Sequence, residues 1–172
     1  MLKNDVEREL NVQIGEETGS AWLYLSMSAY FQAQNLPGFA NWMFVQAQEE
    51  LVHARLFYDF VHQRRGRVTL GAIPAPATEW ASPLEVFQGA FAHEVHITER
   101  IHFLTALADQ AHDYPTQVFL HWFVTEQVEE EANADAIVQK LKMLGDTGPG
   151  LFMIDQELAT RVFTMPAVAV AP

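Results

Sequence analysis

Apolar side chains recur through most of the chain at alternating spacings of three and four residues, which is the period of an amphipathic α-helix. Glycine and proline are concentrated at a few junctions between these long stretches. The pattern predicts four long helices and a short fifth one, over about 5–34, 37–65, 83–111, 114–145 and 151–162. We therefore expect an all-α fold in which the four long helices form a bundle.

The junctions indicate how these helices are connected. The short link at 35–38, Asn-Leu-Pro-Gly, makes the first two helices antiparallel neighbours. Residues 66–82, GRVTLGAIPAPATEWAS, are too rich in Gly and Pro for a helix and too long for a hairpin turn, so we expect a crossover there. A capping box at 82–85, Ser-Pro-Leu-Glu, then starts the third helix. Residues 1–172 are expected to form one domain, with an apolar tail after the fifth helix.

Each of the four apolar stripes is interrupted near its middle by ionisable side chains. The second stripe consists of Phe39, Met43, Gln46, Glu50, His53, Phe57 and Phe60. The other three are broken at Glu17, Glu94 and Glu130. Any one of these residues could lie at the edge of its stripe and reach solvent or a partner. Burying four carboxylates together without cations costs many kcal/mol, so the four acids are either protonated or bound to metal.

The residue types at these positions favour a pair of divalent cations. Two such ions neutralise four carboxylates, and Glu50 and His53 are one helical turn apart, so both can reach the same ion. The chain has no cysteine, which excludes disulfides, thiolate metal sites, iron–sulfur clusters and a cysteine nucleophile. Carboxylate oxygen and imidazole nitrogen suit iron or manganese, and two ions roughly 3.5–4 Å apart could share Glu50 as a bridge.

Composition narrows the classes of partner. The chain has 10 basic and 22 acidic residues and a net charge of -12, which repels nucleic acid and anionic membranes and favours cations. No segment approaches the roughly 18–20 apolar residues of a membrane span. The N-terminus, MLKNDVEREL, is charged and lacks the features of a secretory signal. We therefore expect a cytoplasmic protein without nucleic-acid or membrane partners.

The interruptions also match a known pattern, that of the ferritin-like di-iron bundles. Those bundles use one Glu from each of two helices and Glu-x-x-His from each of the other two. Here Glu17 and Glu94 are the lone acids and 50–53 is an intact Glu-x-x-His, but 127–130 reads Gln-Val-Glu-Glu. With its GFANWM, QEELVHA and FLHWFVTEQVEEE segments, the chain resembles the non-haem bacterial and archaeal ferritins over nearly its whole length. Bacterioferritins carry a haem-ligating Met where this chain has Val52, so no haem is expected.

The resemblance implies a homo-oligomeric, hollow cage of 24 subunits that stores ferric mineral. Fe(II) is oxidised by O2 or peroxide at a di-iron centre within each subunit. Carried over to this chain, the ligands of the first iron are Glu17, Glu50 and His53, and those of the second are Glu50, Glu94 and Glu130. Gln127 is implied as a nearby hydrogen-bonding group, and Tyr24 as a residue that bonds a ligand or gives an electron. Large apolar residues outside the stripes, among them Trp22, Trp42 and Tyr58, include some expected at subunit contacts.

A third iron site on the inner side of the centre is also implied by the family, and Glu49, Glu126 and Glu129 match it. The alternative for these acids is a solvated face. For Tyr24 and for Trp122, a possible second electron donor, the alternative is core packing.

Other features carry less information about the site. His93 and His96 flank Glu94 off the stripe, so we expect them to be exposed. Animal ferritins line their three-fold pores with acids, but the matching stretch here, 116–121, has none, which leaves the route of iron entry open.

Two other classes of function use similar residues. A di-iron oxygenase or oxidase shares the same ligands but needs a pocket for an organic substrate beside the metal ions. Phe57, Ile97 and Phe123 are expected to fill that space. A metal-free structural bundle is the third class, and the four aligned acids argue against it. Ferroxidase activity combined with iron storage is therefore the leading hypothesis.

Overall fold

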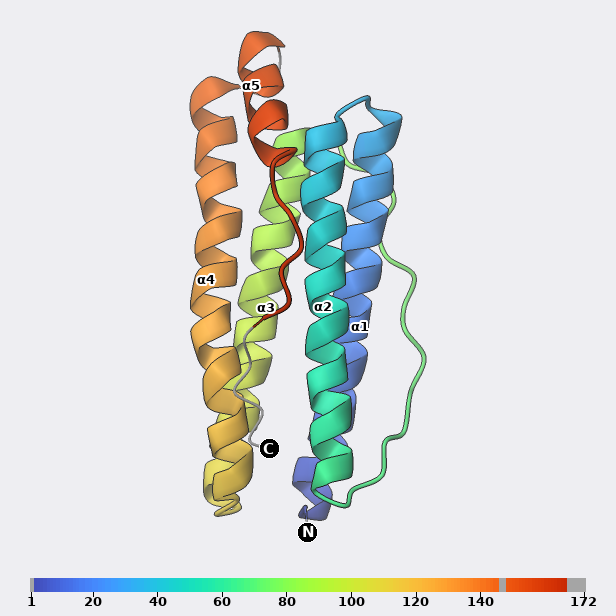
Figure 1. The fold of residues 1–172 in the computed structure, drawn as a ribbon, viewed down its shortest axis with the longest axis vertical. Helices are drawn as coiled ribbons and strands as arrows, with labels where there is room; N and C mark the ends of the chain where they lie inside the picture. Colours follow the sequence, from blue (N-terminus) through green and yellow to red (C-terminus); the bar gives the residue numbers. More distant parts are fainter. Residues whose placement is uncertain (1, 146–147, 167–172) are drawn as a thin grey trace.

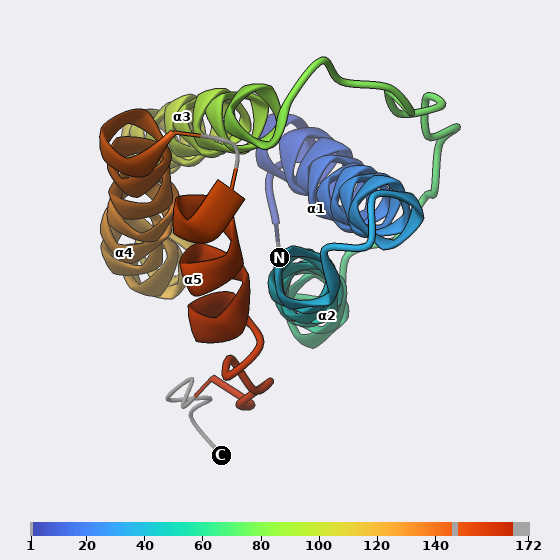
Figure 2. The same cartoon turned by 90° about the horizontal axis from the view of Figure 1, so that it is seen from above.

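The computed structural model describes residues 2–145 and 148–166. Within these residues the chain forms five helices and no strand, which confirms the all-α prediction. The helices are α1 (Asn4–Ala33), α2 (Pro37–Gln63), α3 (Pro83–Gln110), α4 (Tyr114–Leu144) and α5 (Gly148–Leu158). The first four run along the long axis of the molecule (Figure 1), and the view from above places them around a common centre (Figure 2). No helix of the described part has the length and apolar character of a membrane span.

The long helices pair as their connections predict. α1 packs chiefly against α2, and α3 against α4. The crossover between α2 and α3 runs beside α1 along the outside of the bundle (Figure 1). At the start of α3, Ser82 Oγ accepts a hydrogen bond from the Glu85 N–H at 3.2 Å, so the predicted cap is confirmed.

Three of the long helices end through a non-glycine residue in the left-handed region: Asn35 (φ 57°), Arg65 (φ 59°) and His112 (φ 52°). At the end of α2 the Gly66 N–H then bonds the Val61 carbonyl at 2.9 Å, which satisfies an otherwise free backbone acceptor. The predicted end of α2 at 65 was therefore too late. Sequence reasoning assigned the stop to Gly66, whereas the change in backbone direction already occurs at Arg65.

The short fifth helix differs most from its prediction, since it begins and ends earlier than the predicted 151–162. It packs on α2 and α4. Asp155 Oδ1 accepts hydrogen bonds from the N–H groups of Gly38 (2.7 Å) and Phe39 (3.1 Å) and so caps the start of α2. A Cβ at position 38 would lie 1.7 Å from the Asp155 carbonyl oxygen, so this approach requires Gly38.

The apolar core is divided into two clusters. One lies toward α5 and contains Tyr24, Phe31, Phe39, Trp42, Phe87 and Leu141. The other lies toward the opposite end of the bundle and contains Leu10, Ile14, Phe57, Ile97, Leu104 and Phe123. The helix positions between these clusters carry buried polar side chains instead, and this polar layer is described next.

Candidate metal centre

The polar layer consists of eight buried side chains from all four long helices: Gln13, Glu17, Gln46, Glu50, His53, Glu94, Gln127 and Glu130. None of them is more than 5% exposed. They share one level because residues three or four apart lie on one helical face, and the stripes place those faces inward. The four acids that interrupt the apolar stripes are therefore buried and do not reach solvent at a stripe edge.

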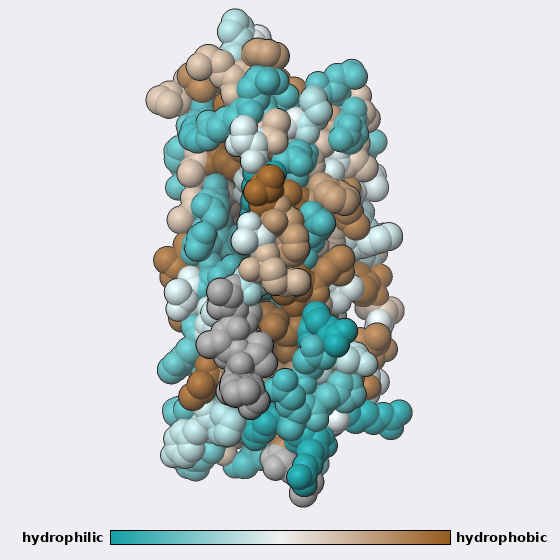
Figure 3. All heavy atoms as spheres, viewed as in Figure 1, coloured by the Kyte–Doolittle hydropathy of each residue, from teal (hydrophilic) through white to brown (hydrophobic). Residues whose placement is uncertain are grey.

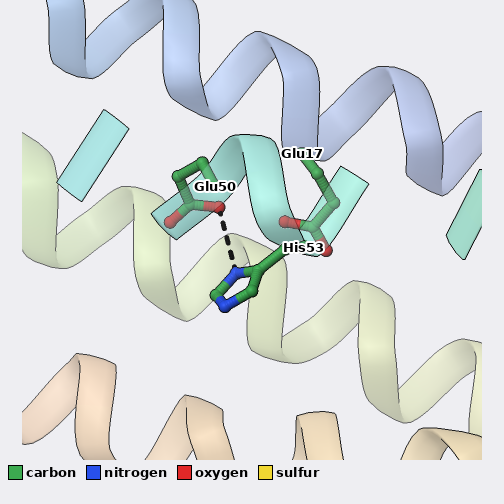
Figure 4. A group of neighbouring side chains, drawn as sticks. All are labelled: Glu17, Glu50 and His53. Atoms are coloured by element: carbon green, nitrogen blue, oxygen red, sulfur yellow. Dashed lines mark ion pairs between the residues drawn. The ribbon is translucent and has the colours of Figure 1, made fainter. Parts of the chain in front are cut away.

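Glu17, Glu50 and His53 form one of two groups of side chains in the described chain that could hold a metal ion (Figure 4). One donor atom from each lies within 4.8 Å of the other two. His53 Nδ1 is 3.4 Å from Glu50 Oε2, while His53 Nε2 and Glu17 Oε2 are buried and have no hydrogen-bond partner among residues 2–145 and 148–166. A buried polar atom without a partner is costly, and a metal ion bound between these side chains would satisfy Glu17 Oε2. The geometry and the donor types of this group fit a cation such as iron.

The other two acids of the layer are held by neutral hydrogen-bond donors. Glu94 Oε1 accepts a hydrogen bond from the Tyr24 hydroxyl, and Glu94 Oε2 accepts one from Gln127 Nε2 at 3.3 Å. Gln46 Nε2 donates to Glu130 Oε2 at 2.7 Å and to Glu50 Oε1 at 3.4 Å. Neutral donors orient these carboxylates but leave their charge uncompensated.

The electrostatics of the layer favour protons in the absence of cations. Burial raises the pKa of Glu17 well above its usual value, and the nearby Glu50 carboxylate adds to the effect. The pKa of Glu50 is likewise raised, by burial first and then by Glu94 and Glu130. Burial and Glu94 raise the pKa of Glu130 to about 8. Burial also raises the pKa of Glu94, and even hydrogen bonds from Tyr24 and Gln127 do not offset it.

The three acids predicted for a third site do not form one group. Glu126 is half-buried and joins His53 and Glu130 in a second set of donor atoms that lie within 4.8 Å of one another. Glu49 instead forms an ion pair with Arg161, and Glu129 is exposed. Of the three, Glu126 is thus brought next to the buried centre, and the predicted third site stays a prediction.

Three contributors were missed by sequence reasoning: Gln13, Gln46 and Arg161. Gln13 Nε2 donates to Glu17 Oε1 at 2.9 Å. Both glutamines precede a buried Glu by four residues, so Gln-x-x-x-Glu on an inward helical face was the signal available for them. Arg161 lies beyond α5, and its contacts on α2 have no signal in the local sequence.

Several neighbouring side chains can now be placed. Tyr24 is completely buried against Glu94, and the Trp122 ring packs edge-on against the His53 ring at 5.5 Å between centroids. His93 is half-buried, 2.7 Å from Ser20 Oγ, so its predicted exposure was wrong, and burial lowers its pKa to about 4. Trp42 is 6% exposed and packs inside this chain, which removes it from the residues expected at subunit contacts.

Comparison with known proteins decides the family. The family described as ferritin-like domain matches residues 7–144, which include the crossover and all of the four long helices except the first three residues of α1. The chain belongs to the ferritin family.

Its relatives among the ferritins are similar over almost the whole chain. A bacterial non-heme ferritin of Bacteroides fragilis (strain 638R) is 43% identical, over 94% of this chain and 100% of the relative. A bacterial non-heme ferritin of Staphylococcus saprophyticus is 39% identical, over 95% of this chain and 98% of the relative. A structure of Archaeoglobus fulgidus ferritin engineered into a closed form has a TM-score of 0.94 at 49% identity and covers 95% of this chain and 100% of that one. An open-pore ferritin of the same archaeon has a TM-score of 0.93 at 48% identity, over 94% and 100%.

Proposed function

We propose that this ferritin chain oxidises Fe(II) inside its helix bundle and stores the ferric product in the hollow of a homo-oligomeric cage. The observation that carries the proposal is the buried group of Glu17, Glu50 and His53, whose atoms Glu17 Oε2 and His53 Nε2 have no partner within the described chain. Membership of the ferritin family supports iron as the metal. A multimeric cage is supported by the similarity to ferritins of known structure, and we propose the 24 subunits that the family resemblance implies.

Two iron ions are assigned to the polar layer in this proposal. Glu17, Glu50 and His53 bind the first, and Glu50, Glu94 and Glu130 bind the second, so that Glu50 bridges them. Each Fe(II) gives one electron to O2, which takes up two protons and leaves as H2O2; with H2O2 as the oxidant, two electrons and two protons yield two molecules of water. The four carboxylates balance two divalent ions, so oxidation leaves excess positive charge that favours movement of ferric product inward.

The chain's own residues support this chemistry in separate ways. The carboxyls with raised pKa values lose their protons as Fe(II) binds, which leaves the bound ions in a neutral site. Tyr24 and Gln127 orient Glu94 by donating to its two oxygens. Tyr24 is also close enough to the layer to supply an electron, as the family resemblance implies.

The space beside the centre favours ferroxidase chemistry over oxidation of an organic substrate. Phe57, Ile97 and Phe123 are each at most 2% exposed and belong to one apolar cluster. The Phe57 and Phe123 rings are 4.3 Å apart between centroids, and the Phe123 ring is 5.8 Å from the His53 ring. Aromatic side chains therefore occupy the position that an organic substrate would need.

The proposal is tested by combining molecular mass with metal binding. Sedimentation of the intact protein should give a closed assembly of about half a megadalton, and anaerobic Fe(II) titration should give two tight ions per subunit. Mixing with O2 should then oxidise both ions in a fast first phase. A stable monomer would exclude storage, because a single bundle has no interior, and one tight ion or none would exclude the di-iron centre.

A further inference from the structure

Arg161 lies on the segment that follows α5 and runs back along the bundle between α4 and α2 (Figure 1). This segment is attached to α2 through Asn41, whose amide Nδ2 donates to the carbonyl oxygens of Arg161 (2.9 Å) and Leu158 (3.3 Å). The Arg161 guanidinium lies 4.4 Å from the centre of the Trp42 ring. Backbone and side-chain contacts thus hold the guanidinium on one face of α2.

The guanidinium contacts two further residues of this face, one and two turns beyond Trp42. Its Nη1 donates to Gln46 Oε1 at 2.8 Å, and its Nη2 donates to Glu49 Oε2. Both partners of the ion pair are only about one-fifth exposed, with 20% of the Arg161 side chain and 18% of the Glu49 side chain accessible. The space-filling view, which has the orientation of Figure 1, shows hydrophobic and hydrophilic residues intermixed on this side of the molecule (Figure 3).

The contact with Gln46 connects Arg161 to the buried centre. A guanidinium can only donate hydrogen bonds, so the oxygen of the Gln46 amide must face Arg161. The NH2 group of the same amide then faces Glu130 and Glu50, as the hydrogen bonds of 2.7 and 3.4 Å show. Arg161 therefore positions carboxylates of the centre through Gln46, and it also forms the ion pair with Glu49.

We propose that Arg161 is a tethered competitor for metal ions at Glu49. A cation that uses the Glu49 carboxylate must displace the guanidinium, and the guanidinium returns to Glu49 when the cation leaves because Asn41 and Trp42 keep it nearby. The inference rests on the proposed function, since Glu49 and Glu126 receive iron only if the buried polar layer binds iron. A trivalent ion displaces a monovalent group more readily than a divalent ion does, so the pair favours ferric product over incoming Fe(II) at this outer position.

The test is anaerobic titration of the intact cage with Co(II), which does not oxidise under these conditions and is followed by its absorption and by calorimetry. The wild type should bind two ions tightly and a further ion weakly. Arg161→Gln should tighten the weak ion by at least about fivefold, because a partly buried ion pair no longer has to open. Lys140→Gln is the matched control, since it removes the same charge from another ion pair, with Glu157 of α5, that does not touch the centre.

Two further variants separate this competition from loosening of the segment. Arg161→Gln combined with Glu49→Gln should bind the weak ion no better than Glu49→Gln alone. Arg161→Lys, which retains the charge but lacks the planar fork that bonds Gln46 and Glu49 from two separate nitrogens, should give an intermediate affinity and serves as the test if Arg161→Gln does not assemble. Equal weak-ion affinity in the Arg161 variants and Lys140→Gln would overturn the inference, as would an Arg161 effect that persists without Glu49. Absence of the two tight ions in the wild type would instead refute the proposed function.

Discussion

Two groups of buried carboxylates in this bundle differ in where their compensation comes from. Asp113 is 6% exposed at the start of α4, and its Oδ1 lies 2.9 Å from Nη1 of Arg64. Burial alone would raise its pKa, but the bonds from Arg64 and Thr116 outweigh burial and lower it. Asp155 is buried as well, and its oxygen caps two N–H groups of α2. Both acids are compensated by charges or donors of the chain itself.

The four acids of the polar layer are buried to the same degree but, in the part of the chain that the structure describes, accept hydrogen bonds only from neutral side chains, namely Gln13, Tyr24, Gln46 and Gln127. Among the described residues, none of these acids pairs with Lys or Arg; Glu50 has only the nearby His53 ring. The pKa values of all four are raised, with burial as the largest cause. The difference indicates that Asp113 and Asp155 stabilise the fold, whereas the layer is completed by protons or by cations from outside.

Glu50→Ala is expected to have the largest effect on oxidation, because Glu50 is the proposed bridge between both ions. The rate of the fast phase in rapid-mixing absorbance should fall on the order of 100-fold. Glu94→Ala and Glu130→Ala should mainly weaken the second ion. Wild-type oxidation rates in Glu50→Ala would show that the ligand assignment is wrong.

Asp113→Ala should show the opposite pattern, with lower stability and an unchanged centre. Removing this carboxylate leaves the largely buried Arg64 without its acid and removes a helix cap, which should cost about 2–4 kcal/mol. Thermal denaturation of the metal-free protein measures the loss, and Fe(II) titration should still give two tight ions. A lost ion in this variant would mean that the two groups of acids are coupled.

The pH dependence of the metal-free protein should separate the two groups further. The pKa of Glu130 is raised to about 8, so the folded state binds more protons than the unfolded chain, and stability falls as pH rises toward 8. The pKa of His93 is lowered to about 4, so this residue makes stability rise with pH, but only below its ordinary pKa of 6.5. Melting temperatures should therefore decrease between about pH 6.5 and 8, and Glu130→Gln should flatten this slope. A slope as steep in Glu130→Gln as in the wild type would argue against a raised pKa at Glu130.

Tyr24→Phe should have a smaller effect, because it removes only the hydroxyl that orients Glu94. Oxidation in stopped-flow absorbance should slow about fivefold to tenfold, while the number of tightly bound ions stays the same. An unchanged rate would reduce Tyr24 to a packing residue.

The smallest effects are expected at the outer acids. Glu126→Gln should lower the number of Fe(II) oxidised per subunit after the first burst, and more strongly than Glu129→Gln, because Glu126 lies within reach of His53 and Glu130 whereas Glu129 is exposed. Glu99→Gln, an exposed acid of α3, is the control. Identical traces for all three variants would assign the outer acids to solvated surface.

The sequence by itself determined the helices and the acids that interrupt them. Helical period is a local property, so the stripes predicted four long helices to within about two residues at each end, and they placed Glu17, Glu50, Glu94 and Glu130 on inward faces. The glutamines Gln13 and Gln46 carried the same local signal four residues before two of these acids, but a hydrogen-bonding glutamine is a weaker signal than a buried charge.

Only the tertiary structure decided which acids find a partner. Asp155 and Arg161 are more than 100 positions from the α2 residues they bond, and nothing in their local sequence indicates those contacts. Nor does the local sequence indicate the ion pair of Asp113 with Arg64, which lie at the start of α4 and the end of α2 and meet only in the folded bundle. A carboxylate's charge is a property of its residue type, but its compensation depends on the distance to a cation or donor, and in this chain long-range packing sets that distance.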